Sequence, residues 1–71
     1  MSEPPSLAEW LRRVEAEYRE MPGLYLTEAE MRRFWGVDDE TCALLIAALV
    51  SSGVLYETPK HRYALAAASR Y

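Results

Sequence analysis

The sequence contains no asparagine and no glutamine among its 71 residues. Those two amides read adenine through paired hydrogen bonds in the major groove of DNA, so the commonest adenine contact is excluded. There is one cysteine, Cys42, and a single cysteine cannot form an internal disulfide. The chain is therefore compatible with a reducing compartment, and we expect a cytoplasmic protein.

Residues for metal binding and catalysis are equally scarce. His61 is the single histidine and has no neighbouring Cys or second His to complete a normal ligand set. The acidic run at 38–40 lacks the alternating ligands and the glycine of a calcium loop, and it stands where a helix cap belongs. No glycine-rich phosphate loop or Ser/His/Asp set is present. We expect no metal, no cofactor, no small-molecule substrate and no enzymatic activity.

Long apolar runs are also missing. The longest, Cys42 to Val50, is about half of the roughly 20 residues that cross a bilayer, and the first ten residues lack the features of a signal peptide. No membrane association is expected. The net charge of −3 is uneven, because the acids concentrate before Thr41. Long-range attraction to a polyanion is therefore small, and any nucleic-acid contact would need a local basic patch.

Local signals predict three helices. Two capping boxes, Ser6 with Glu9 and Thr27 with Glu30, each precede a stretch of apolar residues at the helical period. The first helix is expected to stop at the Pro-Gly pair at 22–23, the second at a glycine at 36, and the third, over 39–52, at Gly53.

Two of these helices have a defined apolar face. In the second helix the side chains of Met31, Phe34 and Trp35 are expected to point inward. The inward face of the first helix is predicted to consist of Leu7, Trp10, Leu11, Val14, Tyr18 and Met21.

Short extended segments complete the predicted fold. The run at 24–27 is expected to be one strand of a small sheet, and the segments at 54–57 and 62–65 a hairpin with Pro59 at the second turn position. The fold class is thus mainly α with a small antiparallel β-sheet, an α+β domain. We expect a flexible leader at 1–5, one domain at 6–66 and a C-terminal tail at 67–71.

The element order and several motifs resemble the winged helix-turn-helix family. The resemblance covers residues 24 to 65 and rests on Gly36 and Val37 in the helix-helix turn, "LVSSGVL" at 49–55 and "TPKHRY" at 58–63. Within this family the chain resembles a small, single-domain, bacterial-type member, which has three helices plus a wing hairpin. In DNA-binding members the helix corresponding to 39–52 lies in the major groove and the wing holds phosphates. Other members bind RNA or assemble with proteins.

The third helix is apolar on nearly all sides, and it begins with acids. Its outward face lacks every side chain that reads guanine or adenine, so we expect an interaction module that binds a protein partner or a second copy of the chain. The alternative is that the first helix covers this face within the same chain. The inward set is Cys42, Leu45, Ile46 and Leu49. The interaction set is Glu40, Ala43, Leu44, Ala47 and Ala48.

The basic residues suggest a second function, a DNA-binding transcriptional regulator that uses its wing and dimerises. Two or three phosphate contacts would give only weak, sequence-blind binding. The same charges would equally keep the edge of the hairpin soluble. The candidate phosphate contacts are Arg32, Arg33, Lys60, His61 and Arg62.

Eight aromatic residues are a further signal. Trp10, Phe34 and Trp35 fall on inward helical positions, so a stacking platform for single strands is the lesser alternative. Three tyrosines are expected to be half-exposed on the sheet, where they would support a partner contact or pair across the strands. These are Tyr25, Tyr56 and Tyr63.

Overall fold

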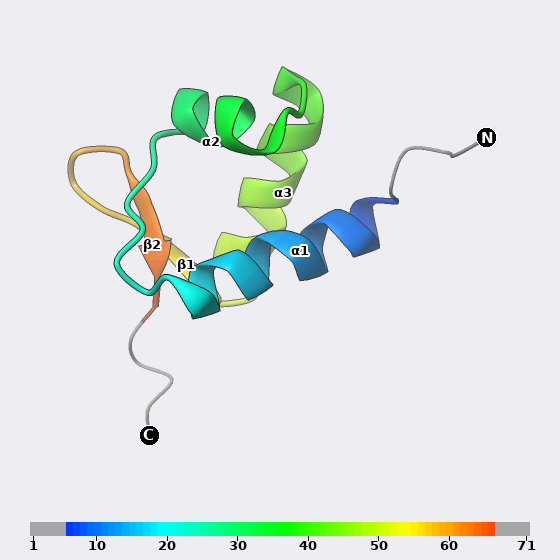
Figure 1. Ribbon diagram of the computed structural model, residues 1–71. Coiled ribbons are helices and arrows are strands. Elements are labelled where there is room, and N and C mark those ends of the chain that lie inside the picture. Colours follow the sequence, from blue (N-terminus) through cyan, green and yellow to red (C-terminus); the bar gives the residue numbers. More distant parts are fainter. Residues whose placement is uncertain (1–5, 67–71) are drawn as a thin grey trace.

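In the part of the chain that the computed structural model describes, there are three helices and a two-stranded antiparallel sheet, which is the α+β class that the sequence predicts (Figure 1). The structure describes residues 6–66, so the expected leader at 1–5 and tail at 67–71 lie outside the described residues. Within that range no helix is long and apolar enough to cross a membrane. The elements are α1 (Leu7–Glu20), α2 (Glu28–Trp35), α3 (Asp39–Ser51), β1 (Leu55–Glu57) and β2 (Tyr63–Leu65).

Side-chain caps begin all three helices where the sequence predicts them. Before α1, the Glu9 N–H donates to Ser6 Oγ and the Ser6 N–H to Glu9 Oε1, both at 3.2 Å. Before α2, the Thr27 N–H donates to Glu30 Oε1 at 2.9 Å and the Glu30 N–H to Thr27 Oγ1 at 3.2 Å. These bonds satisfy backbone groups that the first helical turn leaves unpaired.

Glycine ends α2 and follows α3, as predicted. Gly36 and Gly53 have φ values of 68° and 84°, the left-handed region that other residues rarely adopt. After α3 the Gly53 N–H donates to the Val50 carbonyl at 3.1 Å, and the Val54 N–H donates to the Leu49 carbonyl at 3.0 Å. This pair of bonds is a Schellman motif, which reverses the chain and directs it into β1.

The hairpin is confirmed, with Leu55 opposite Leu65 and Glu57 opposite Tyr63. Its turn is closed by the His61 N–H, which donates to the Thr58 carbonyl at 2.9 Å, so Pro59 occupies the second turn position. By contrast, the predicted strand at 24–27 is reduced to a single bridge, between Leu26 and Tyr63. The predicted strand was too long, because only Leu26 is aligned with β2 before the chain enters α2.

His61 offers a test of backbone strain in this turn. It is the single non-glycine residue with a positive φ (61°) among residues 6–66. We expect His61→Gly to stabilise the domain by about 1 kcal/mol, because glycine adopts this conformation without steric cost. Urea unfolding of both proteins measures the difference.

Lys60→Gly is the matched control for this turn. Lys60 has no positive φ, so glycine there only loses backbone entropy and should destabilise by about 0.5–1 kcal/mol. If both variants lower stability equally, the left-handed residue is not strained.

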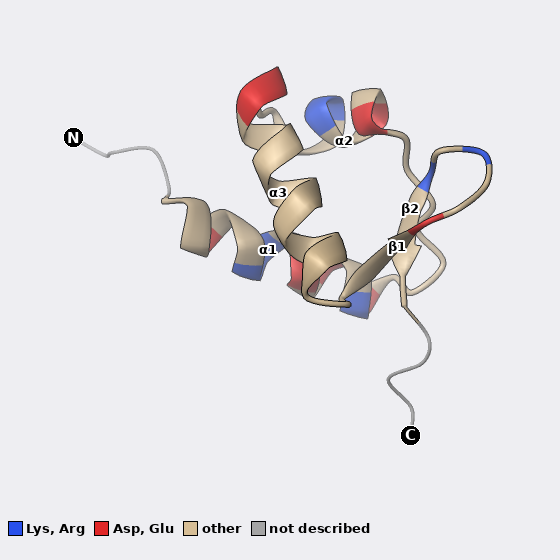
Figure 2. Cartoon of the chain, turned by 180° about the vertical axis from the view of Figure 1, so that it is seen from behind, with Lys and Arg blue, Asp and Glu red and all other residues tan. Residues whose placement is uncertain are grey.

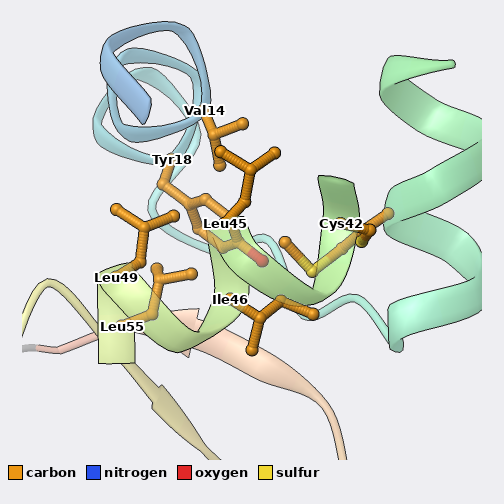
Figure 3. Packing of buried hydrophobic residues seen from close by; sticks show 8 residues of the cluster. Val14, Tyr18, Cys42, Leu45, Ile46, Leu49 and Leu55 are labelled. Carbon is orange, nitrogen blue, oxygen red and sulfur yellow. The ribbon is translucent and has the colours of Figure 1, made fainter. Parts of the chain in front are cut away.

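The core lies between α1 and α3 and continues onto the sheet (Figure 3). Val14 and Tyr18 of α1 point at Leu45 and Leu49 of α3, and Leu55 of β1 closes the cluster. The predicted inward face of α1 is correct in its middle and wrong at its ends. Leu7, the first residue of α1, and Met21, the residue that follows its last turn, are exposed, because both lie beyond the part of the helix that packs on the core.

The α2 helix packs on the core through Met31, which is buried, and Trp35, whose ring centroid lies 6.1 Å from that of Tyr18. The expectation for Phe34 was wrong, since half of this residue is exposed. Adjacent helical residues are about 100° apart, so a two-turn helix that directs Trp35 inward turns Phe34 away. The Phe34 ring stands edge-on to Trp35, with centroids 4.7 Å apart.

Candidate interaction surfaces

The side of α3 opposite α1 carries an exposed surface of mostly uncharged residues. Figure 2 shows charged residues in α3 only at the start of the helix. Leu44 lies at the centre of this surface and is 53% exposed, whereas the adjacent Leu45 packs against α1 and is only 1% exposed. Four of the five residues of the predicted interaction set are exposed, and Ala48 is half-buried. We call this surface the α3 outer face. It consists of Glu40, Ala43, Leu44, Ala47, Val50 and Ser51.

One end of the α3 outer face is acidic. Asp38 caps the helix by accepting from the Thr41 N–H at 3.0 Å, and hydrogen bonding from Thr41 lowers the pKa of Asp38. Asp39 pairs with Arg32 of α2 at 2.9 Å, while Glu40 makes no ion pair within residues 6–66. A phosphate-dense surface would meet these carboxylates first, and like charges repel.

The structure separates the five candidate phosphate contacts into two groups. Arg32 is paired with Asp39, and His61 Nδ1 lies 2.8 Å from Glu57 Oε2. Lys60 and Arg33 are exposed and make no ion pair in the described part of the chain. Only these last two side chains are free to approach a phosphate without breaking an existing ion pair or hydrogen bond.

Arg62 belongs to the paired group and connects three segments. Its Nη1 donates to the Tyr25 carbonyl at 3.0 Å and lies 3.1 Å from Glu30 Oε1. The Thr27 N–H and Arg62 together lower the pKa of Glu30, the Thr27 bond being the larger cause. Arg62 therefore holds the base of the wing to the start of α2, a structural role that the sequence did not reveal.

Phe34 forms part of a shallow depression that the sequence analysis missed. About 420 Å³ in volume, the depression is lined by Leu26, Glu30, Arg33 and Phe34. The missed signal was the Phe-Trp pair, because two adjacent aromatic residues on a two-turn helix cannot both face the same core. Phe34 is exposed and is therefore not one of the buried aromatic residues, contrary to the prediction that it points inward.

The tyrosines on the sheet are exposed to different extents. Tyr25 and Tyr56 are about half-exposed, and a hydrogen bond between their side chains raises the pKa of Tyr56. Tyr63 is less exposed, and its carbonyl accepts a hydrogen bond from the Tyr18 hydroxyl. Tyr25 lies outside the strands, and in the sheet Tyr56 is opposite Ala64, so none of the three tyrosines faces another across the two strands.

Cys42 is buried, as its inward position predicts (Figure 3). Its Sγ lies 3.8 Å from the Glu28 carbonyl, and burial raises the pKa of the thiol. A raised pKa disfavours the thiolate, which is the reactive form of cysteine. No group of three His, Cys, Asp or Glu residues suited to a metal ion occurs among the residues that the structure describes.

No family model, no curated protein and no solved structure matches this chain. The chemistry of the α3 outer face and of the wing therefore carries the functional argument.

Proposed function

We propose that this chain is a winged-helix domain that acts as a protein-interaction module through the α3 outer face. The observation that carries the proposal is Leu44, a leucine 53% exposed between two exposed alanines, Ala43 and Ala47. Small residues beside a large apolar one allow another helix to approach closely. An exposed apolar surface on a small domain is typical of a site for protein contact.

The family assignment is supported by the arrangement of the elements. The α2 and α3 helices are joined by a short turn that begins at Gly36, and α3 leads directly into a hairpin whose loop projects from the body (Figure 1). In addition, Leu26 bridges β2, which is the place of a third strand beside a wing. This order of elements is compatible with a winged helix-turn-helix domain and supports the proposal.

Binding of DNA through the wing is the competing function, and the ion pairs argue against it. Phosphate contact by Arg32, His61 or Arg62 would compete with a carboxylate that each already holds within about 3 Å. The amide-free α3 outer face offers no side chain that reads guanine or adenine. Lys60 and Arg33 alone would support weak binding without sequence preference.

We expect the protein to bind duplex DNA more weakly than about 1 µM at physiological salt, in the non-specific range. Lys60→Glu should weaken the residual binding further, because only Arg33 would then remain free to contact phosphate. Arg12→Glu, the same change of charge on an exposed residue of α1, should matter less. Filter binding of random duplex DNA at low and moderate salt measures the affinity of the wild type and of both variants. Light scattering of each protein alone measures its state of association.

Arg62 is not a suitable residue for this experiment, since its replacement would release the wing from Glu30 and Tyr25. A nanomolar, sequence-selective complex would contradict the proposal and support the regulator function instead.

A further inference from the structure

We propose that the partner of the α3 outer face is a second copy of this chain, whose α3 packs antiparallel across a two-fold axis. The inference rests on the proposed function and names its partner. Two-fold symmetry requires one surface to be complementary to itself, so that each residue meets a suitable residue when the helix is reversed. The α3 outer face has this property in both its shape and the placement of its polar groups.

Shape is complementary at the centre of the face. With the axis between positions 45 and 46, Leu44 of each copy lies opposite Ala47 of the other. A large side chain therefore meets a small one twice, instead of leucine meeting leucine. Both residues are exposed, and the small Ala47 lets the two helix axes approach to about 8 Å.

Polar groups are complementary at the two ends of the face. The same axis places Glu40 opposite Ser51 of the second copy, and a serine hydroxyl donates readily to a carboxylate. The side chains of Glu40 and Ser51 are exposed and make no hydrogen bond or ion pair with any residue of the 6–66 segment. Each copy thus supplies the group that the other lacks.

Charge also selects the antiparallel orientation. The acids of α3 all lie in its cap and first turn. In a parallel pair the two Asp39 and Glu40 carboxylates would stand side by side. In an antiparallel pair they lie about 16 Å apart along the helix, at 1.5 Å per residue, which exceeds the screening length of about 8 Å at physiological salt.

The size of the face predicts a weak dimer. A 13-residue helix is about 20 Å long and 10 Å wide, so it covers far less than the roughly 800 Å² per partner of a stable interface. We therefore expect a dissociation constant on the order of 0.1 mM, so that monomer and dimer are both populated at concentrations of about 0.1 mM.

Sedimentation equilibrium from about 10 µM to about 2 mM spans this range. Leu44→Glu should weaken the dimer at least tenfold, because each interface would bury two unpaired carboxylates. The matched control is Leu7→Glu, which places the same charge on an exposed leucine of α1 outside the face. Circular dichroism should show both variants folded, since both leucines are exposed.

Ser51→Lys tests the orientation. In the antiparallel pair each new lysine meets Glu40 of the second copy, so the dimer should tighten about fivefold at low salt through two surface ion pairs. Ser51→Glu should weaken it. In a parallel pair Ser51→Lys would bring two lysines together, and weakening by this variant would overturn the antiparallel arrangement.

The remaining outcomes overturn the second copy as the partner. One is that the protein stays monomeric up to about 2 mM. Another is that Leu44→Glu leaves the dissociation constant of the dimer unchanged. The third is that Leu7→Glu weakens the dimer as much as Leu44→Glu does. The proposed interaction function fails by a different result, the nanomolar duplex complex described above. The two failures are therefore distinguishable.

Discussion

Leu45→Ala is expected to destabilise the domain by about 2–5 kcal/mol, the range for removal of a buried leucine side chain from a packed core. Leu45 is almost completely buried against Val14 and Tyr18 of α1. Since the whole stability of a domain of this size is about 5 kcal/mol, the variant should be partly or fully unfolded at 25 °C. Urea unfolding followed by circular dichroism at 222 nm on the helices measures the loss.

Leu44→Ala, one position earlier on the same helix, is the matched control. The chemical change is identical, and half of Leu44 is exposed to solvent. Its cost should stay within about 0.5 kcal/mol, as for other surface substitutions. Equal losses of stability in the two variants would mean that α3 is rotated about its axis, with Leu44 as well as Leu45 in the core. The assignment of Leu44 to the α3 outer face would then be wrong.

Alkaline pH should also destabilise the domain, chiefly through Tyr18. Burial raises the pKa of Tyr18 from 10.0 to about 12, and its hydroxyl donates to the Tyr63 carbonyl at 2.7 Å. The unfolded chain loses this proton near pH 10 and the folded chain only near pH 12. The neutral Tyr18 therefore stabilises the fold fully below pH 10, and about 2 kcal/mol is lost as the pH rises to about 12.

Tyr18→Phe separates this contribution from other alkaline effects. At pH 7 the variant should lose about 1 kcal/mol, because the hydrogen bond is gone while the ring remains in the core. Between pH 10 and about 12 its unfolding free energy should then fall less than that of the wild type. The pKa values of Tyr56 and Tyr63 are raised as well, so part of the decrease persists. An identical decrease in both proteins would contradict the assignment to Tyr18.

The caps and stops of the helices were determined by the sequence alone. Each capping box joins a side chain to a backbone group three residues away. Gly36 and Gly53 adopt a left-handed conformation that glycine reaches without steric cost. Such interactions depend on a few consecutive residues, so reading the order of residues is sufficient to locate them.

The helical period also assigns Leu44 and Leu45 to different sides of α3 from the order of residues alone. Periodicity relates residues on one helix to each other, and it does not say which side another element will cover. The α1 helix packs on the side of Leu45 and leaves Leu44 exposed. The choice between an internal core and a free surface was therefore made by the contact of two helices far apart in the sequence.

Only the tertiary structure decided which aromatic and basic side chains remain available. Trp35 turns inward because Tyr18 of α1 lies beside it, and Phe34 is left at the surface. Arg62 pairs with Glu30, a residue 32 positions earlier in the chain. Ion pairs and aromatic contacts over such separations depend on how whole elements pack, which no local pattern encodes. The helices were thus set by neighbouring residues, and the surfaces by their packing.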